Sequence, residues 1–229
     1  MPAVSFEPQS VTPLGWLFVL AITVALPAAV FRNREAALAM ASIPLRYRFV
    51  AMLIPQIGLG LFAGITASVE GVSLFPMTPP AARDWAAGLL FLVTTVAIVR
   101  PFWRRSILEG RLAWRLFAPT DPQERRMWVA LSLSAGIAEE MVWRGVLPAL
   151  LSRAFGDARL AIALATVSFG VAHAIQGARS VLAIAAIALA FHGLVLLSGS
   201  LYVAMAAHFV YDVIAGFTYE RMARELGHL

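Results

Sequence analysis

The stretch AEEMVWRGVL, Ala138 to Leu147, decides how this sequence is interpreted. Two adjacent carboxylates, Glu139 and Glu140, and a single Arg144 stand in a segment that is otherwise almost wholly apolar. A charged side chain is costly at the depth of a lipid bilayer, so charges inside an apolar span usually mark a functional site. The stretch therefore raises two questions together: whether it crosses a membrane, and what its charges do there.

The composition predicts a polytopic membrane protein. Of the 229 residues, 60% are hydrophobic and only 14% are charged, and the mean hydropathy is +0.79. Soluble domains carry about one-quarter charged residues, so no soluble class fits as well. The absence of cysteine excludes disulfides and thiol chemistry. The net charge of +5 comes from basic residues scattered between apolar segments, which favours membrane topology and no nucleic-acid partner.

The apolar segments predict an all-α bundle of seven transmembrane helices, with eight as the alternative. Each segment is close to the ~20 residues that cross a hydrocarbon core, although the third is short. The first has no basic region before it, so we expect a retained helix and not a cleaved signal peptide. The predicted spans are Leu14–Phe31, Phe49–Val69, Trp85–Ile98, Met127–Leu151, Arg159–Ile175, Ser180–Leu197 and Ser200–Phe217.

The arginines predict the orientation of these spans. Apart from Arg144, one side of the bundle would carry only Arg83, Arg153 and Arg159. The other side would carry Arg32, Arg34, Arg46, Arg48, Arg100, Arg104, Arg105, Arg111, Arg115, Arg125, Arg126, Arg179, Arg221 and Arg224. Cytoplasmic loops are enriched in basic residues. We therefore expect an integral protein of the cytoplasmic (inner) membrane, with its N-terminus outside and its C-terminus in the cytoplasm.

Three parts of the chain are expected to differ in role. Residues 1–101 would form an N-terminal transmembrane layer, and residues 126–229 the core, made of the last four spans, in which the candidate functional residues lie. Between them, residues 102–125 alternate arginines with large apolar side chains in WRRSILEGRLAWRLFAP. This pattern predicts an amphipathic helix on the cytoplasmic surface.

The strongly polar residues of the membrane interior fall within the last four spans, and the first three carry none. At 100° per residue, Glu140 and Arg144 lie on one helix face and predict a structural ion pair, whereas Glu139 lies on another face and would be free to face a cavity. His208 and Asp212 have the same spacing and could act as one unit. Depth along the helices places Glu139, His208 and the other polar groups at comparable levels, which predicts one shared polar cavity.

The residues of this cavity fit two kinds of chemistry. A carboxylate and an imidazole flanking a water make a general-base system, and a second imidazole can stabilise an oxyanion. Glu139, His173 and His208 could instead bind zinc, with one position left for water. We expect no metal, because the histidines are on separate spans and lack the spacing that forms a zinc site on one helix. His192 matches no motif and is expected to be an interhelical hydrogen-bonding residue.

Three motifs in order resemble the CPBP family of CAAX prenyl endopeptidases and bacteriocin-processing intramembrane proteases, also called the abortive-infection family. They are EExxxR (Glu139 to Arg144), FxxxH (Phe169 and His173) and HxxxD (His208 and Asp212). The resemblance covers about residues 125–217. It implies that Glu139 and His173 activate water and that His208 and Asp212 stabilise the oxyanion. Asn often stands where Asp212 is here, and an ionised Asp cannot donate to an oxyanion, so Asp212 would orient His208 instead.

The function expected from the resemblance is an intramembrane endopeptidase of the glutamic, CAAX-protease-like type. Glu139, Glu140, His173, His208 and Asp212 form the candidate catalytic set, with zinc as an alternative. The partners would be the lipid bilayer and a membrane-embedded protein or lipidated peptide as substrate. A proton- or ion-coupled transporter is the alternative, because relays also use intramembrane Glu, His and Asp. A non-catalytic family member acting in bacteriocin immunity is a further alternative.

Overall fold

The computed structural model describes residues 10–33, 35, 39, 42–110 and 112–229. Arg34 and Arg111, two of the arginines used to predict orientation, lie outside these residues. Every regular element in the described part is helical. In chain order the elements are α1 (Pro13–Leu20), η1 (Ala21–Ala25), α2 (Leu26–Arg32), α4 (Leu45–Glu70), α5 (Ala82–Leu108), α6 (Leu112–Phe117), α7 (Pro122–Glu140), η3 (Met141–Val146), α8 (Leu147–Phe155), α9 (Ala158–Ala172), η4 (Ala174–Gln176), α10 (Ala178–Ser198) and α11 (Leu201–Glu225).

Two of the long helices contain a π-helical segment. The elements α1, η1 and α2 form one helix from Pro13 to Arg32, and α7, η3 and α8 follow one another without a break from Pro122 to Phe155. Within the described part of the chain, five helices are long and apolar enough to cross a membrane: Pro13–Arg32, α4, α5, α10 and α11. With the charged α7–α8 helix and the shorter α9, they confirm the predicted polytopic all-α bundle. The third span, expected to be short, is the longest of the five at 27 residues.

Residues with known capping preferences set the ends of the helices around the candidate site. Asp157 accepts backbone hydrogen bonds at the start of α9, and Ser200 does so at the start of α11. Gly156 and Gly199 follow α8 and α10 in the left-handed conformation, with φ of 70° and 63°, which favours glycine. These short turns hold α8 against α9 and place α11 directly after α10.

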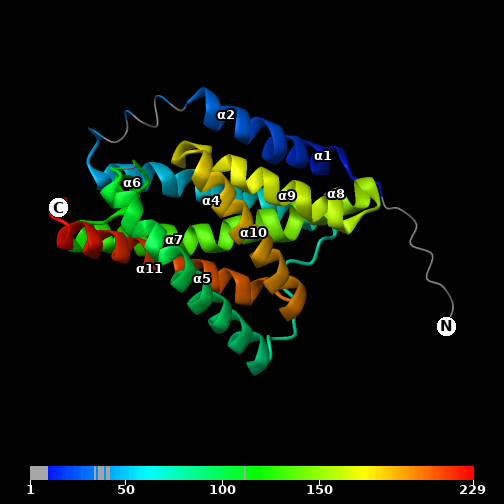
Figure 1. Cartoon of the computed structure of the whole chain (residues 1–229). Helices are drawn as coiled ribbons and strands as arrows, with labels where there is room; N and C mark the ends of the chain where they lie inside the picture. Colours follow the sequence, from blue (N-terminus) through cyan, green and yellow to red (C-terminus); the bar gives the residue numbers. More distant parts are fainter. Residues whose placement is uncertain (1–9, 34, 36–38, 40–41, 111) are drawn as a thin grey trace.

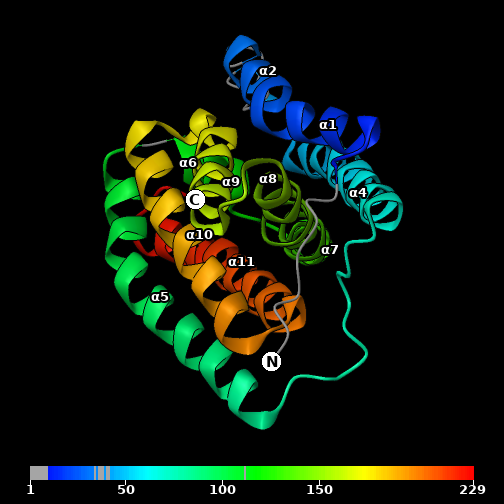
Figure 2. The ribbon, with the colours of Figure 1, turned by 90° about the vertical axis from the view of Figure 1, so that its right-hand side faces the viewer.

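The α7–α8 helix occupies the centre of the bundle. It packs against α4 on one side and α11 on the other, and α8 continues onto α9. The helix from α1 to α2 lies outside α4 and α9, and α5 lies outside α10 and α11 on the opposite flank (Figure 2). The start of α1 and the end of α11 lie at opposite ends of the bundle (Figure 1).

Apolar side chains form both the interior and the outer surface of the bundle. Val142, Val146, Leu147 and Leu150 of the central helix are completely buried in the largest core cluster. Other large apolar side chains point outwards from the peripheral helices, where their exposed fractions exceed one half; they include Leu17, Ile54, Leu61, Leu90, Val93, Leu182 and Leu196. An outer surface of this kind suits lipid and not water, so the chain is an integral membrane protein.

The region predicted as an amphipathic surface helix is organised differently. Helix α5 continues to Leu108, so the first part of the segment extends a membrane span. There Trp103 and Ile107 are buried against Met222 and Ala223 of α11. A turn with Gly110 at a φ of 63° separates α5 from the short helix α6. The prediction of a single surface helix is therefore wrong. Trp103 and Ile107, two of the apolar residues on which it was based, pack the end of α5 against α11.

Candidate active site

The two glutamates are the last residues of α7, immediately before the π-helical segment η3. Both are buried, with Glu139 8% exposed and Glu140 completely enclosed. π-helical segments are rare and frequently occur at functional sites. The change of helix type begins at the residue after Glu140, so the turn that carries Arg144 does not follow the regular α-helical spacing.

Gly136 brings α7 into close contact with α11, the helix that carries His208. A Cβ atom at this position would stand 2.9 Å from the backbone nitrogen of Phe209 and 3.0 Å from the carbonyl oxygen of Met205. Both atoms belong to the backbone, which moves less readily than the end of a side chain. Only glycine allows this approach, and Glu139 and Glu140 follow it by one turn.

A Gly136→Ala substitution is expected to push α7 away from α11. The added methyl group costs about 1–3 kcal/mol if the helices stay packed. A displacement of about 1 Å in a catalytic site can reduce the rate on the order of 100-fold, so we expect activity to fall by at least tenfold. Cleavage assays and thermal unfolding measure the two effects. Gly193→Ala on α10, where a Cβ meets nothing within 4 Å, should change neither, and equal activity of both variants would contradict the close-approach argument.

Glu140 has two partners. Its Oε1 lies 3.1 Å from Arg144 Nη1 in an ion pair whose side chains are 1% and 0% exposed. The same oxygen accepts a hydrogen bond of 2.7 Å from His208 Nδ1. The sequence predicted the first contact and missed the second, because helical spacing relates residues of one helix and not of two. Arg144 also lies 4.5 Å from the ring centre of Phe169 and 5.2 Å from that of Phe191.

Each carboxylate oxygen of Glu139 has a polar neighbour on another helix. Gln56 of α4 donates a hydrogen bond from Nε2 to Glu139 Oε1. The other carboxylate oxygen, Oε2, lies 3.8 Å from His208 Nε2. The expectation that the first three spans contribute no polar residue is therefore wrong. The available signal was a lone amide, Gln56, next to Pro55 in an apolar run.

His208 lies among three carboxylates. Its Nδ1 donates to Glu140, since an ionised carboxylate can only accept, and its Nε2 lies 3.8 Å from Glu139 and 3.6 Å from Asp212. These two distances exceed hydrogen-bond length, so Nε2 is oriented toward both acids without being bound to either. Trp128 of α7 donates to the carbonyl oxygen of Asp212 at 2.9 Å and fixes this turn of α11. The i,i+4 relation of His208 and Asp212 is present as the sequence suggested.

His173 stands at the C-terminal end of α9 and is half-buried. Its Nδ1 donates a hydrogen bond of 2.8 Å to the carbonyl oxygen of Phe169. A carbonyl cannot donate, so Nδ1 carries the proton, and in the neutral ring Nε2 keeps a lone pair. The four-residue spacing of the FxxxH motif thus lets the carbonyl oxygen of Phe169 fix the orientation of the His173 ring. Among the interactions of the described residues, no hydrogen bond or ion pair joins His173 to Glu139.

Phe169 connects His173 to the charged cluster. The ring centres of Phe169 and His173 are 4.6 Å apart, and Arg144 lies at a similar distance from the same ring. Trp143 packs on Phe169 edge-on at 5.1 Å. Two of the three motifs therefore meet through an aromatic ring, while the first and third meet through direct polar contacts.

His192 of α10 does not act as the sequence suggested. Its side chain is buried, with 4% exposed. Its Nε2 has no hydrogen-bond partner in the part of the chain that the structure describes. The predicted interhelical hydrogen bond from this nitrogen is therefore not formed.

The candidate zinc ligands are not grouped as a metal site. Among residues 10–33, 35, 39, 42–110 and 112–229, no three His, Cys, Asp or Glu side chains are placed to hold a metal ion. Glu139 and His208 lie near each other, but His173 is oriented by Phe169 and contacts neither. As placed, these three residues do not form one set of metal ligands.

The fold and this cluster define an integral membrane protein with a buried carboxylate–histidine site. Residues 122–214 match the family model described as Rce1-like, type II CAAX prenyl endopeptidase Rce1-like. The similarity of this segment to that family confirms the resemblance to the CPBP intramembrane endopeptidases and indicates a protease. The matched segment contains all three motifs. No curated protein and no solved structure matches the chain significantly.

Proposed function

We propose that this protein is an intramembrane endopeptidase that hydrolyses a peptide bond with a water activated by Glu139. The observation that carries the proposal is the buried arrangement of Glu139 Oε2 and His208 Nε2, 3.8 Å apart. Each is oriented through its other polar atom, Glu139 by Gln56 and His208 by Glu140. General acid–base catalysis requires reactive groups held in a defined orientation, as Glu139 is by Gln56 and His208 is by Glu140.

Hydrolysis at this site follows from the groups present. A water within hydrogen-bond distance of Glu139 Oε2 and His208 Nε2 gives its proton to Glu139, and its oxygen adds to the carbonyl carbon of the substrate. With a proton on Nε2, His208 donates to the oxyanion of the tetrahedral intermediate. The C–N bond then breaks, and the leaving amine takes the proton held by Glu139. Glu140 orients the ring through Nδ1 in this scheme, and the negative charge of Asp212, 3.6 Å from Nε2, stabilises the protonated imidazole.

His173 is proposed to assist at the edge of the same site. Its proton on Nδ1 is committed to the carbonyl of Phe169, so Nε2 of the neutral ring accepts a hydrogen bond from water or from the substrate. Its ring lies against Phe169, on which Arg144 also packs. A small rotation of the end of α9 upon substrate binding would change its distance to the glutamates, because the residue caps that helix.

The substrate and the setting are proposed from the place of the site in the membrane. The glutamates lie in the interior of the bundle, so the scissile bond must enter from the bilayer in a membrane-embedded or lipid-anchored substrate. We further propose the cytoplasmic membrane, with the N-terminus outside and the C-terminus inside, from the arginine distribution. Residues 126–229 are proposed as the catalytic core, to which α4 contributes Gln56.

The proposed function is tested with the full chain in proteoliposomes. Membrane-embedded and lipid-anchored reporter peptides are incubated with the protein, and new termini are identified by mass spectrometry. We expect cleavage that persists in the presence of a strong chelator, and less than one zinc per chain by elemental analysis. Stoichiometric zinc, lost together with activity and restored on re-addition, would assign Glu139 and His208 to metal binding. Proton flux without any cleavage would favour the transporter alternative instead.

A further inference from the structure

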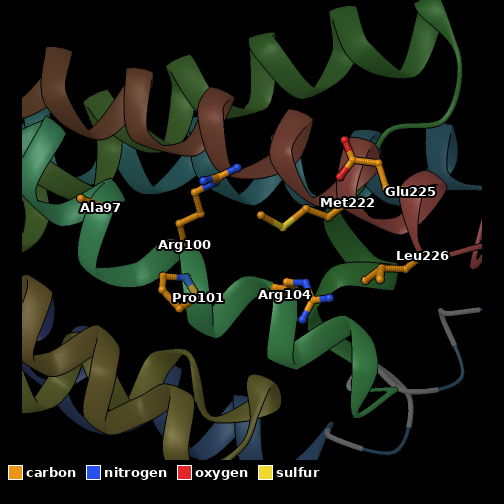
Figure 3. Close-up of a pocket in the computed structure, with 7 residues that line it drawn as sticks. All are labelled: Ala97, Arg100, Pro101, Arg104, Met222, Glu225 and Leu226. Atoms are coloured by element: carbon orange, nitrogen blue, oxygen red, sulfur yellow. The ribbon is translucent and has the colours of Figure 1, made fainter.

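A pocket of about 720 Å³ lies at the end of the bundle where α5 and α11 terminate, away from the candidate active site. Ala97, Arg100, Pro101 and Arg104 of α5 form one wall, and residues at the end of α11 form the other (Figure 3). The wall from α11 consists of Met222, Glu225 and Leu226. The pocket therefore combines two guanidinium groups with an apolar floor.

The positive charge of Arg100 and Arg104 is not neutralised by Glu225, the acidic residue of the pocket lining. Glu225 pairs with Arg221 at 2.9 Å, outside the pocket lining. Arg100 and Arg104 form no ion pair or hydrogen bond with any residue that the structure describes. They are four residues apart, so both stand on one face of α5, and both are exposed. The pocket thus offers two free guanidinium groups to an anion.

The same face of α5 continues as an apolar stripe into the membrane. At 100° per residue, Leu90, Val93 and Ala97 fall within about 60° of the mean direction of Arg100 and Arg104. Leu90 is 68% exposed and Val93 58% exposed. The distance along the helix from Leu90 to Arg100 is about 15 Å, which is about half the thickness of a hydrocarbon core. The stripe and the arginines therefore match the length of one lipid molecule, whose acyl chain would lie along the stripe and whose headgroup would lie at the arginines.

We propose that this pocket binds the phosphate headgroup of an anionic phospholipid. Guanidinium groups pair with phosphate through two parallel hydrogen bonds, and two of them can hold one headgroup. Under the predicted orientation the pocket faces the cytoplasmic leaflet, whose anionic lipids attract basic residues near the surface. The bound lipid joins α5 to the end of α11, the helix that carries His208.

Native mass spectrometry of the full chain in detergent tests this site, with phosphatidylglycerol and phosphatidylcholine of identical acyl chains as probes. The wild type is expected to retain one phosphatidylglycerol in preference to phosphatidylcholine. R100Q/R104Q should lose affinity for it by about fivefold for each arginine removed. R100K/R104K, which keeps both charges, should lose less. R126Q/R179Q removes two exposed arginines that also lack an ion pair in the described chain, and it should bind like the wild type.

Three results would overturn the proposal. One is equal retention of the two lipids by the wild type. Another is an equal loss of phosphatidylglycerol in R100Q/R104Q and R126Q/R179Q, which would mean a general charge effect. The third is binding of inorganic phosphate or glycerol phosphate as strongly as the lipid, which would make the pocket a site for a free anion. Thermal unfolding of each variant ensures that folded proteins are compared, and none of these readouts requires proteolysis.

Discussion

Replacement of Glu139 by Gln is expected to abolish cleavage while the protein keeps its fold. The amide cannot take a proton from water, and loss of a general base typically costs 10²–10⁴-fold in rate, so we expect at least about a 100-fold loss. The amide oxygen can still accept the hydrogen bond from Gln56, which now reaches Glu139 Oε1. The packing between α4 and α7 is therefore kept. Reporter cleavage and thermal unfolding in detergent provide the two measurements.

A matched control for this change is Asp157→Asn. It also converts a carboxylate to an amide, but at the N-terminal cap of α9, where Asn caps as well as Asp does. Activity and stability of this control should equal those of the wild type. A Glu139→Gln protein that cleaves the reporter at a rate near wild type would remove Glu139 from the role of base.

Glu140→Gln is expected to lower stability as well as activity. The substitution leaves Arg144 buried without its carboxylate, since the two side chains are 1% and 0% exposed. Breaking a buried ion pair from one side typically costs about 3–5 kcal/mol. The same change weakens the anchor of His208 Nδ1, so the imidazole loses its fixed orientation. We expect a clearly lower unfolding temperature and a strong reduction of cleavage.

The double variant Glu140→Gln, Arg144→Met separates these two effects. Removing both charges avoids the unpaired guanidinium, and replacement of a buried pair by apolar groups is often neutral for stability. Stability should therefore recover in part, whereas activity should stay low because His208 still lacks its ionised partner. A single Glu140→Gln protein as stable as the wild type would contradict the buried pair.

Periodicity and hydropathy predicted the seven helices because a span is a local property of about twenty residues. The pairing of Glu140 with Arg144 was predictable for the same reason, since both stand on one turn. Contacts between helices could not be predicted in this way. Gln56 contacts Glu139, and His208 contacts Glu140, but the sequence does not show which spans are neighbours in the bundle. The π-helical segment after Glu140 was also beyond prediction, since no residue of MVWRGV marks it. His173 could be placed on its helix, but its distance from Glu139 depends on how α9 packs.

A single oxygen atom, Glu140 Oε1, contacts both Arg144 and His208. A substitution at position 140 should therefore reduce both the stability of the fold and the cleavage activity, whereas a conservative substitution at position 139 should reduce the cleavage activity alone. A library of variants scored in parallel for abundance and for a cellular phenotype would consequently distinguish the two neighbours. Substitutions at 140 should lower both scores, and conservative ones at 139 only the second. Such a comparison could locate the reactive carboxylate before any substrate is known.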